Sequence, residues 1–428
     1  MIYEEALTYL ESLAAFGSQL GLARIEKLLD LMGNPQNRYK TIHVTGTNGK
    51  GSTAVMIKTI LTAAGISTAL YTSPHLVSYT ERMVLNNKEV SRDGFAAVIG
   101  YTAQFVAQMV EMGFDHPTEF EVLTAAAFQL FADQAVEYAV IEVGLGGLLD
   151  STNVIIPELA VITNVTLEHM DRCGNTVELI AGHKAGIIKQ GRPVITAATG
   201  AALTVIKQRA AELGSDIRIY GEDFFSEITS HTLAGQKIHF NDRNIEFTAQ
   251  ISLLGTHQAK NAALAVAAVF TLAQQDGRLT IAALQQGLKQ TQWPGRFEVC
   301  EGQPLLIFDG AHNPAGIKVL RQTVNEYFPG RGLVFVLGIL RDKAISEMLT
   351  VLLSPQDKVV VTVPRSERAC PAADLARQIK ELGINDAVRI EENICDAVAL
   401  ARQWAGTEGI VCVAGSLYLI GAARQCFR

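Results

Sequence analysis

The stretch that most constrains the fold runs from Ile42 to Thr53, IHVTGTNGKGST, where an apolar run breaks into glycines and a lysine before helical periodicity begins. Glycines permit the tight turn that aims backbone N–H groups at an anion, and a following helix adds its positive end. The pattern predicts a phosphate loop in which Lys50 reaches the outer phosphates. Val44 and Gly51 depart from the general pattern, so a plain tight connection is the alternative.

The elements around this loop alternate as a parallel sheet with crossover helices requires. A strand ends at Val44, a helix runs from the loop to about Ala64, and residues 68–71 form the next strand. Further strands are expected at 138–143, at 159–165 and, as short alternating segments, over 224–253. Apolar residues at helical spacing predict helices at 3–16, 22–32, 93–112, 117–134, 176–188 and 257–273.

The chain changes character at Gln292–Arg296, where Trp-Pro-Gly interrupts it and a new series of strands and helices begins. We therefore expect an α/β protein of two domains, 1–295 with the phosphate loop in a parallel sheet and 296–428, smaller and doubly wound. In the second domain Asp309 ends a strand just before a helix, so its loop is expected to face a cleft. A simple turn or cap role for Asp309 is the alternative.

Polar residues follow the strands at the carboxyl edge of the first predicted sheet, where ligands of parallel sheets bind. Glu142 is a single acid in an otherwise apolar strand, which is costly without a compensating partner, and His169 follows the next strand. With a hydroxyl they could share one magnesium ion, although His169 as an ordinary loop histidine is an alternative. Lys184, on the predicted helix 176–188, either keeps its tip in water or, facing a metal, must be neutral or chemically modified.

Thr118 and Glu121 form a capping-box pattern at the start of the predicted helix 117–134. In such a box the hydroxyl and the carboxylate satisfy backbone N–H groups of the first turn. A structural cap and a ligand contact are both open for Glu121, and the two roles can coexist.

Composition narrows the class of protein. The chain has 428 residues and a net charge of -7 without a long basic run, which argues against nucleic acid as a partner. Its apolar runs are too short to span a bilayer, and residues 1–13 show no export signal. The six cysteines are scattered, so neither a metal cluster nor a disulfide framework is expected, and a reducing cytoplasm is the expected location.

Short motifs along the whole chain, in order, resemble the folylpolyglutamate synthase and dihydrofolate synthase family, a branch of the Mur-type amide ligases. The matching stretches are Thr45–Ser52, Thr72–Leu76 with Glu81–Arg82, Thr118–Glu121, Glu142–Gly147 with Asp150–Asn153, His183–Ile188, His257–Asn261, Trp293–Phe297, Asp309–Pro314 and Gly415–Tyr418. The resemblance implies a Mur central-domain-like fold at the N-terminus and a smaller Rossmann-like glutamate ligase domain at the C-terminus.

The resemblance also implies an ATP-dependent ligase that phosphorylates a carboxylate and lets the amine of L-glutamate displace the phosphate. The acceptor would be a folate or dihydropteroate. The implied cofactors are ATP, two magnesium ions, a monovalent cation and an N6-carboxylated Lys184, whose carbamate turns a cation into an anion that can face a metal. A monomer in the cytoplasm, without nucleic acid or membrane partners, is expected, with the active site in the cleft between the domains.

Carried over residue by residue, the resemblance implies roles for specific side chains. The implied nucleotide contacts are Thr47, Asn48, Gly49, Lys50, Gly51, Ser52, Asn261, Arg296 and Asp309. The implied metal ligands are Ser73, Glu142, His169 and Lys184, and the implied catalytic residues are Lys50, Lys184 and His312. The implied acceptor contacts are Leu22, Thr118, Glu119, Phe120, Glu121, Leu149, Asp150 and Ser151.

Three positions depart from the usual family pattern. Leu148 stands where members commonly have arginine, Glu168 replaces the commoner aspartate, and Ala344 stands where an acid is common. Two alternatives therefore stay open. One is another Mur-type ligase acting on a cell-wall nucleotide, for which the segment before the phosphate loop is too short to hold the usual extra domain. The other is an ATP-binding relative that has lost catalysis.

Overall fold

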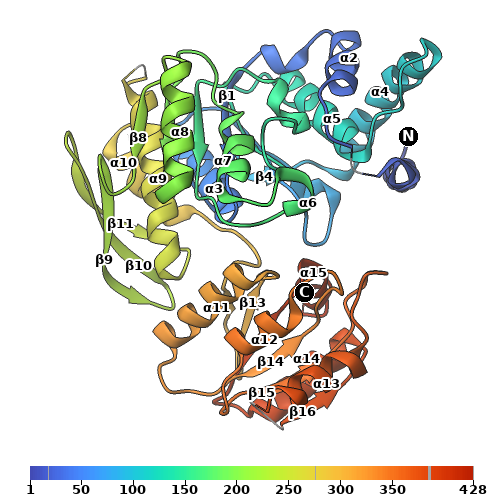
Figure 1. Ribbon diagram of the computed structural model, residues 1–428, viewed down its shortest axis with the longest axis vertical. Helices are drawn as coiled ribbons and strands as arrows, with labels where there is room; N and C mark the ends of the chain where they lie inside the picture. The colour runs from blue at the N-terminus through green and yellow to red at the C-terminus, as the bar shows by residue number, and fades with distance from the viewer. Residues whose placement is uncertain (18, 275, 384–386, 428) are drawn as a thin grey trace. The chain divides into compact units, whose positions relative to one another are not determined.

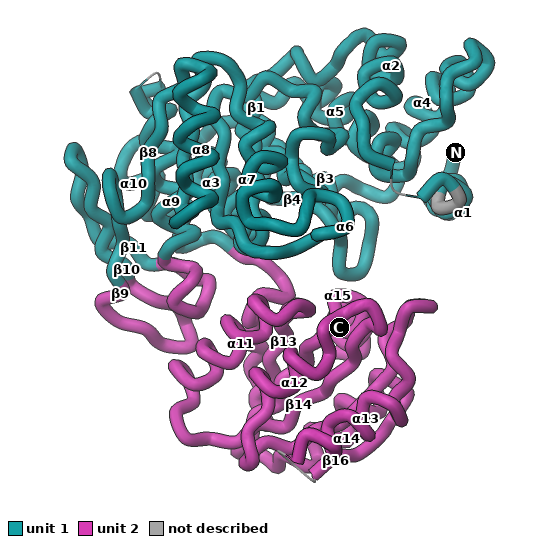
Figure 2. Tube along the Cα trace, viewed as in Figure 1, with its two compact units in different colours: residues 1–227, 238–250, 260–291 teal, residues 228–237, 251–259, 292–428 magenta. Residues whose placement is uncertain are grey.

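The computed structural model describes residues 1–17, 19–274, 276–383 and 387–427. Its chain divides into two units, drawn in teal and magenta in Figure 2. Unit 1 comprises residues 1–227, 238–250 and 260–291, and unit 2 comprises residues 228–237, 251–259 and 292–428. Both units combine helices with a mostly parallel sheet, so the predicted α/β class is confirmed.

Unit 1 is built on a sheet that, in the described residues, has eight strands (Figure 1). The strands are β1 Lys40–Thr45, β2 Thr68–Tyr71, β3 Met83–Leu85, β4 Lys88–Glu89, β5 Tyr138–Glu142, β6 Leu159–Ile162, β7 Val194–Thr196 and β8 Ile217–Ile219. Their order is β4-β3-β2-β5-β1-β6-β7-β8. Strands β2, β5, β1, β6, β7 and β8 pair in parallel with their neighbours. Strands β3 and β4 form an antiparallel edge next to β2, which the sequence analysis did not predict.

Helices cover the sheet of unit 1, and most begin close to the predicted positions. The α-helices are α1 Tyr3–Ser12, α2 Ala23–Leu31, α3 Lys50–Ala63, α4 Arg92–Glu111, α5 Glu119–Asp133, α6 Met170–Cys173, α7 Val177–Ala185, α8 Gly200–Glu212, α9 Thr256–Ala273 and α10 Ile281–Gln290. Short 3₁₀ turns are η1 Leu13–Phe16, η2 Pro35–Asn37, η3 Tyr79–Arg82 and η4 Ser151–Val154. The predicted helix 3–16 is thus α-helical only to Ser12. The first residues of α9 group with unit 2 and the remainder with unit 1.

The packing of unit 1 follows the alternation of side chains along its strands. Ala139 and Ile141 of β5 are fully buried in a cluster with residues of α2, α4 and α5, whereas Val140 between them points to the other face of the sheet. Elsewhere in unit 1, helices α3 and α10 cross at close range. A Cβ added at Gly287 of α10 would come within 2.4 Å of Ile60 Cα of α3. Glycine at this position lets the two helix backbones meet.

The predicted section of short strands over 224–253 is present as β9 Phe224–Thr232, β10 Gly235–Asp242 and β11 Glu246–Ile251. These strands form a three-stranded sheet in the order β11-β10-β9. Phe240 contacts Phe224 and Phe247, with ring centroids 6.2 Å and 5.5 Å away. The aromatic cluster supplies the apolar packing that a small sheet needs.

Unit 2 contains a second sheet that, over the residues described, has six strands in the order β12-β13-β17-β14-β15-β16. The strands are β12 Glu298–Cys300, β13 Leu305–Asp309, β14 Val334–Leu337, β15 Lys358–Val361, β16 Val388–Ile390 and β17 Ile410–Ala414. The helices are α11 Pro314–Tyr327, α12 Ile345–Leu352, α13 Ala372–Glu381, α14 Ile394–Ala405 and α15 Leu417–Gln425. All strand pairs are parallel except the pair of β12 with β13, so the expected second α/β sheet is confirmed.

The structure corrects the expectation about cysteines. Cys395, at the start of α14, and Cys426, just after α15, form a disulfide across 31 residues of sequence. Spacing along the chain does not reveal this pair, because only the packing of α14 against α15 brings the two sulfurs together. Among the described residues, no helix combines the length and the apolar character that crossing a membrane requires.

Candidate active site

The carboxyl ends of the central strands of unit 1 lie at one edge of the sheet. In the parallel register Val44 of β1 is level with Glu142 of β5, and Thr45 is level with Ile162 of β6. The loops that follow these strands therefore leave from the same edge. This is the edge at which the sequence analysis expected the phosphate loop, Glu142 and the segment of His169 to start.

The phosphate loop is the turn between β1 and α3. Gly46 has a φ of 150° and Gly49 has a φ of 84°, a region of backbone space that L-residues rarely adopt. Gly49 is the N-cap of α3, so the first helical N–H groups face the loop. Lys50 folds back over the turn and donates from Nζ to Gly46 O at 2.9 Å and to Thr47 O at 3.0 Å. The ammonium is thereby held against the loop that was predicted to bind phosphate.

Two residues just beyond β6, Thr163 and Asn164, brace this loop. Asn48 N donates to Asn164 Oδ1 at 3.0 Å, and Asn48 O accepts from Asn164 Nδ2 at 2.9 Å and from Thr163 Oγ1 at 2.7 Å. A Cβ added at Gly46 would lie 1.8 Å from Thr163 Oγ1, so only glycine fits there. The sequence analysis missed both residues, although their position directly after a strand at the ligand edge was a usable signal.

Asn261, a predicted nucleotide contact, comes from α9. A Cβ added at Gly49 would lie 2.5 Å from Asn261 Oδ1, so the amide is packed directly against the phosphate loop. Asn261 is buried. Asn261 therefore packs against the phosphate loop although it lies more than two hundred positions away in sequence.

Ser73 and Glu142, two of the predicted metal ligands, are neighbours. Ser73 N donates to Glu142 Oε2 at 3.3 Å, and Glu142 is buried at the end of β5. A buried carboxylate is costly unless positive charge compensates it. A carboxylate beside a serine hydroxyl supplies the oxygen ligands that Mg²⁺ prefers, so these residues fit a magnesium site.

Lys184 lies on α7 and is buried, so the alternative of a lysine with its tip in water is wrong. Burial and the nearby Lys50 ammonium lower the pKa of Lys184 to about 7, while the Glu168 carboxylate and the Cys173 thiol act in the opposite direction. A Cβ added at Gly147 would lie 3.2 Å from Lys184 Cα, so the glycine loop after β5 packs on this part of α7. The amine therefore lies in electrostatic range of the phosphate loop and is easily made neutral.

His169 is the N-cap of the short helix α6 and has a left-handed φ of 50°. Its side chain is 46% exposed, and its Nε2 lies 3.8 Å from Glu168 Oε1. Within the described chain no three His, Cys, Asp or Glu side chains are grouped for metal binding. A magnesium site here would therefore depend on the mixed set of hydroxyl, carboxylate and imidazole that the sequence analysis named.

A cavity of about 340 Å³, termed the acceptor cavity below, opens beside Ser73. It brings together six of the eight residues that the resemblance implied as acceptor contacts. Its lining residues are Gly17, Gln19, Leu20, Ser73, Pro74, Arg82, Thr118, Glu119, Phe120, Gly144, Leu145, Leu149, Asp150 and Ser151. Because Ser73 lines the cavity and also contacts Glu142, the cavity adjoins the candidate metal ligands.

Leu22 and Glu121, the other two implied acceptor contacts, are not among these lining residues. Leu22 packs against the buried cluster of the N-terminal helices. Glu121 is fully buried and accepts from Thr118 N at 2.7 Å, while Thr118 Oγ1 accepts from Glu121 N at 3.3 Å. Arg24 Nε donates to the same carboxylate at 3.1 Å. The predicted capping box is confirmed, because a glutamate at this helical position folds back over its own helix start.

Two charged residues shape the cavity in ways the sequence did not reveal. Asp150 accepts from Leu145 N at 2.7 Å and from Thr152 N at 3.0 Å, so it fixes the loop after β5, and burial raises its pKa. Arg82 lines the cavity and donates from Nε to His75 Nδ1 at 2.9 Å. The Glu81–Arg82 motif by itself indicates no role for the arginine, which the cavity lining supplies.

A larger depression of about 540 Å³ lies near Lys40 and Tyr138, at the amino ends of β1 and β5. Arg278, one of its lining residues, forms ion pairs with Glu137 and Asp276, each at 2.7 Å. The lining charges therefore compensate one another. Ligands of parallel sheets bind at the opposite, carboxyl end of the strands, so the acceptor cavity is the better candidate site.

In unit 2 the loop after β13 gathers the remaining predicted residues. Asp309 accepts from Phe297 N and Ala311 N at 2.8 Å and 2.9 Å, so the turn role considered as the alternative is present. Burial raises the pKa of Asp309, against the effect of Arg296. A Cβ added at Gly310 would lie 3.1 Å from Arg296 Nη1, and His312 Nδ1 is 2.7 Å from Gly310 O. Arg296, Asp309 and His312 thus form one cluster.

Comparison with known proteins adds to this geometry. The family described as Mur ligase middle domain matches residues 44–269, and the one described as Mur ligase, glutamate ligase domain matches residues 295–417. A Bacillus subtilis protein named dihydrofolate synthase/folylpolyglutamate synthase is 33% identical over 99% of this chain and 98% of its own.

Two solved structures resemble the whole chain. A Mycobacterium tuberculosis folylpolyglutamate synthase complexed with ADP and AMPPCP has a TM-score of 0.90 at 33% identity and covers 100% of this chain and 99% of that one. An Escherichia coli FolC in complex with DHPP and ADP has a TM-score of 0.87 at 28% identity, over 99% and 97% of the two chains. The fold is therefore shared with these two proteins over nearly the whole length of both chains.

Proposed function

We propose that this chain, which belongs to the folylpolyglutamate synthase and dihydrofolate synthase family of Mur ligases, uses ATP to join L-glutamate to the carboxylate of a folate or dihydropteroate. The observation that carries the proposal is the place of Ser73. It lines the acceptor cavity, and its backbone N–H contacts Glu142. Glu142 is in register with Val44 of β1, the strand that leads into the phosphate loop.

The first step is the attack of the acceptor carboxylate on the terminal phosphate of ATP, which gives an acyl phosphate and ADP. Both reactants are negative, so positive charge has to lie between them. Lys50 supplies one such charge from the loop of Thr47, Asn48, Gly49, Gly51 and Ser52. Bound magnesium would supply further positive charge, held by Ser73, Glu142 and His169.

Lys184 is proposed to carry an N6-carboxyl group. A buried amine next to the Lys50 ammonium is disfavoured as a second cation. Addition of carbon dioxide to the neutral amine forms an N–C bond and releases one proton, which leaves a carbamate anion. That anion would hold a second magnesium ion and would turn the repulsion by Lys50 into attraction. A bound monovalent cation is part of the same proposal.

In the second step the amine of L-glutamate attacks the acyl carbon, and phosphate leaves with the C–O bond electrons. Asn261 of unit 1 and Arg296 and Asp309 of unit 2 are proposed to contact the nucleotide, and His312 is proposed as a catalytic residue of the glutamate ligation. Acyl phosphates hydrolyse in water, so the site must exclude water while the amine attacks.

We also propose that residues 1–295 act as the ATP-binding domain with the pterin site and residues 296–428 as the glutamate ligase domain. The match of the glutamate ligase family to residues 295–417 supports this division. A monomer in the cytoplasm, where ATP is available, is proposed as the working form.

The experiment that tests this function supplies ATP, magnesium, L-glutamate and each pterin acceptor in turn to the full chain. Mass spectrometry of the acceptor and a parallel assay of ADP release are the readouts. A gain of one glutamate with one ADP released supports the proposal. ATP binding without ADP release or a change in acceptor mass would instead favour an ATP-binding relative that has lost catalysis.

A further inference from the structure

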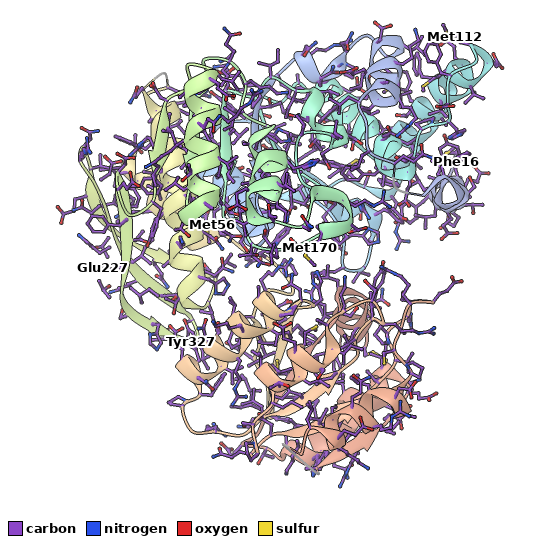
Figure 3. The ribbon with its side chains drawn as sticks, viewed as in Figure 1. Phe16, Met56, Met112, Met170, Glu227 and Tyr327 are labelled. Atoms are coloured by element: carbon purple, nitrogen blue, oxygen red, sulfur yellow. A yellow bond between two sulfur atoms is a disulfide. The ribbon has the colours of Figure 1, made fainter. Side chains whose placement is uncertain are left out.

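Arg296, a proposed nucleotide contact, lies between two residues with left-handed backbone conformations. Gly295 has a φ of 71° and Phe297 has a φ of 44°. A positive φ is rare for a bulky side chain, so the surrounding structure must hold Phe297 in place. The Phe297 ring is buried near Tyr327, labelled in Figure 3, with the two ring centroids 5.9 Å apart. The backbone on both sides of Arg296 is therefore held in an uncommon conformation.

Two carboxylates hold the residues on either side of Arg296. Phe297 N donates to Asp309 Oδ2 at 2.8 Å, and Gly295 N donates to Glu298 Oε2 at 2.8 Å. Hydrogen bonds to an ionised carboxylate are stronger than those between neutral groups. Asp309 is already among the proposed nucleotide contacts, whereas Glu298 has no part in that proposal.

Glu298 is in turn held by the last helix of unit 2. Arg424 of α15 donates from Nη2 to Glu298 Oε1 at 2.8 Å, and the two side chains are 14% and 24% exposed. Because Arg424 occupies one oxygen of Glu298, the other oxygen stays directed at Gly295 N. The two oxygens have different donors, which restricts rotation of the carboxylate.

Helix α15 also contacts the loop that follows β13. A Cβ added at Gly310 would lie 2.6 Å from Leu417 Cδ2 and 3.1 Å from Arg296 Nη1. Gly415 N, just before the helix, donates to Ala311 O at 3.1 Å. The first turn of α15 therefore packs beside the loop where the Arg296 guanidinium lies, and its last turn carries the arginine of the ion pair.

We propose that Glu298 is a positioning residue for Arg296, and that Arg424 supports it by keeping the Glu298 carboxylate on Gly295 N–H. The Arg296 backbone is then fixed on one side by Glu298 and on the other by Asp309. An arginine that is fixed in advance loses less conformational freedom when it binds an anion, so it binds a phosphate group more tightly. The inference rests on the proposed function, because it concerns a nucleotide contact of that reaction.

The alternative is that this ion pair only stabilises unit 2. A pair of the same kind provides a matched control. Arg321 Nη1 donates to Asp357 Oδ2 at 2.9 Å, and Asp357 Oδ1 accepts from Leu333 N at 2.9 Å. These residues lie at the amino ends of β14 and β15, whereas Asp309 lies at the carboxyl end of β13. Arg321→Met should therefore lower stability without changing nucleotide affinity.

The test measures the Kd of the full chain for ADP with magnesium by titration calorimetry, a readout that does not require ligase activity. Arg296→Met should raise this Kd roughly tenfold, as expected when one charged hydrogen bond is lost. Glu298→Gln should raise it about fivefold, because its amide has one acceptor oxygen where the carboxylate uses two. Arg424→Met should raise it about threefold, since Glu298 keeps its bond to Gly295 N.

A double-mutant cycle separates positioning from stability. If Glu298 acts through Arg296, adding Glu298→Gln to Arg296→Met should change the Kd for ADP by less than about 1.5-fold. The loss of thermal stability that Glu298→Gln causes should persist in the double variant. A full fivefold effect on the Kd in the Arg296→Met background would overturn the inference. Wild-type affinity in Glu298→Gln, beside weakened binding in Arg296→Met, would overturn it too.

Other outcomes distinguish this inference from the proposed function. A wild-type chain that does not bind ADP would reject both. Wild-type affinity in Arg296→Met would reject Arg296 as a nucleotide contact and with it the role of Glu298, while glutamate gain on a pterin acceptor would still decide the ligase function. Should Glu298→Gln fail to fold, Arg424→Met in the same cycle, compared with Arg321→Met, gives the decision.

Discussion

The phosphate loop and the acceptor cavity lie in the same unit, yet they are built in different ways. The loop is one contiguous segment, in which Gly46, Gly49 and Lys50 follow one another between a strand and a helix. The cavity is assembled from segments scattered between Gly17 and Ser151. A contiguous site can be recognised from a motif. An assembled site is not visible in any one local pattern: family resemblance implied six of the residues that line the cavity, but only the folded chain shows that they and the other lining residues lie together.

The difference is one of degree, because the loop also depends on distant partners. Asn48 is held on both its N–H and its carbonyl by Asn164. His43 of β1, the strand that ends in the loop, lies 2.8 Å through Nε2 from Thr152 Oγ1, two residues beyond the cavity residue Asp150. The hydrogen bond between His43 and Thr152 therefore links the strand that leads into the phosphate loop to the segment that lines the acceptor cavity.

The largest expected effect tests the contiguous site. Lys50→Ala should lower glutamate-dependent ADP release by roughly a hundred- to a thousandfold, because no ammonium would then offset the charge of the transferring phosphate. Steady-state ADP release is the measurement. Lys88→Ala, at an exposed position of β4, is the matched control and should behave as the wild type. Near-normal turnover of Lys50→Ala would contradict the phosphate-loop assignment.

The next effect tests how far the loop depends on its distant brace. In Gly46→Ala the new Cβ would overlap Thr163 Oγ1 at a positive φ. We expect a KM for ATP raised by roughly tenfold or more, and stability lowered by about 1–3 kcal/mol from overpacking. Gly65→Ala is the control, since its φ of 77° is also positive but no atom lies within 4 Å of the added Cβ. If both variants kept the wild-type KM for ATP, the brace would have no role in nucleotide binding.

A pH effect tests the connection between the two regions. Burial, and secondarily Lys189, lower the pKa of His43 to about 3. Below the unfolded pKa of about 6.5 the unfolded chain binds a proton at this residue and the folded chain does not, so stability falls as the pH falls toward 3. His43 alone should contribute a loss of about 2 kcal/mol between pH 6.5 and pH 5.

Urea unfolding at a series of pH values measures this contribution in the wild type and in His43→Gln. The variant should show a shallower loss of stability on acidification. His75 and His257, whose pKa values burial also lowers, remain in both proteins and cancel in the comparison. A difference in stability that stays constant from pH 7 to pH 5 would show that His43 does not titrate in this way.

The smallest effect tests the wall of the acceptor cavity. Thr118→Ala removes the N-cap hydroxyl of α5 and should lower stability by about 1 kcal/mol, whereas Thr118→Ser keeps the hydroxyl and should stay within a few tenths of the wild type. The denaturant midpoint is the measurement. Equal stability of the alanine and serine variants would mean that the hydroxyl is dispensable as a cap.

The strands of the first sheet and the capping box of α5 could be predicted because their signals are local. Periodicity located β5 and β6 to within a few residues, and the Thr118–Glu121 spacing predicted a cap that the structure contains. The edge strands β3 and β4 and the Cys395–Cys426 disulfide could not be predicted in the same way, since both depend on pairing partners set by packing.

By itself the sequence determined the glycine turn between β1 and α3, the alternation of strands and helices, and the family to which the chain belongs. Glycine conformations, hydrogen bonds at helix starts and the periodic burial of apolar faces each depend on residues a few positions apart. They can therefore be predicted from local sequence patterns. Only the tertiary structure decided that Thr163 and Asn164 hold Asn48, that Arg82 faces the acceptor cavity and that Leu148 lies beside Lys184's helix. Those neighbours result from the close packing of strands and helices far apart in the chain, which no local pattern encodes.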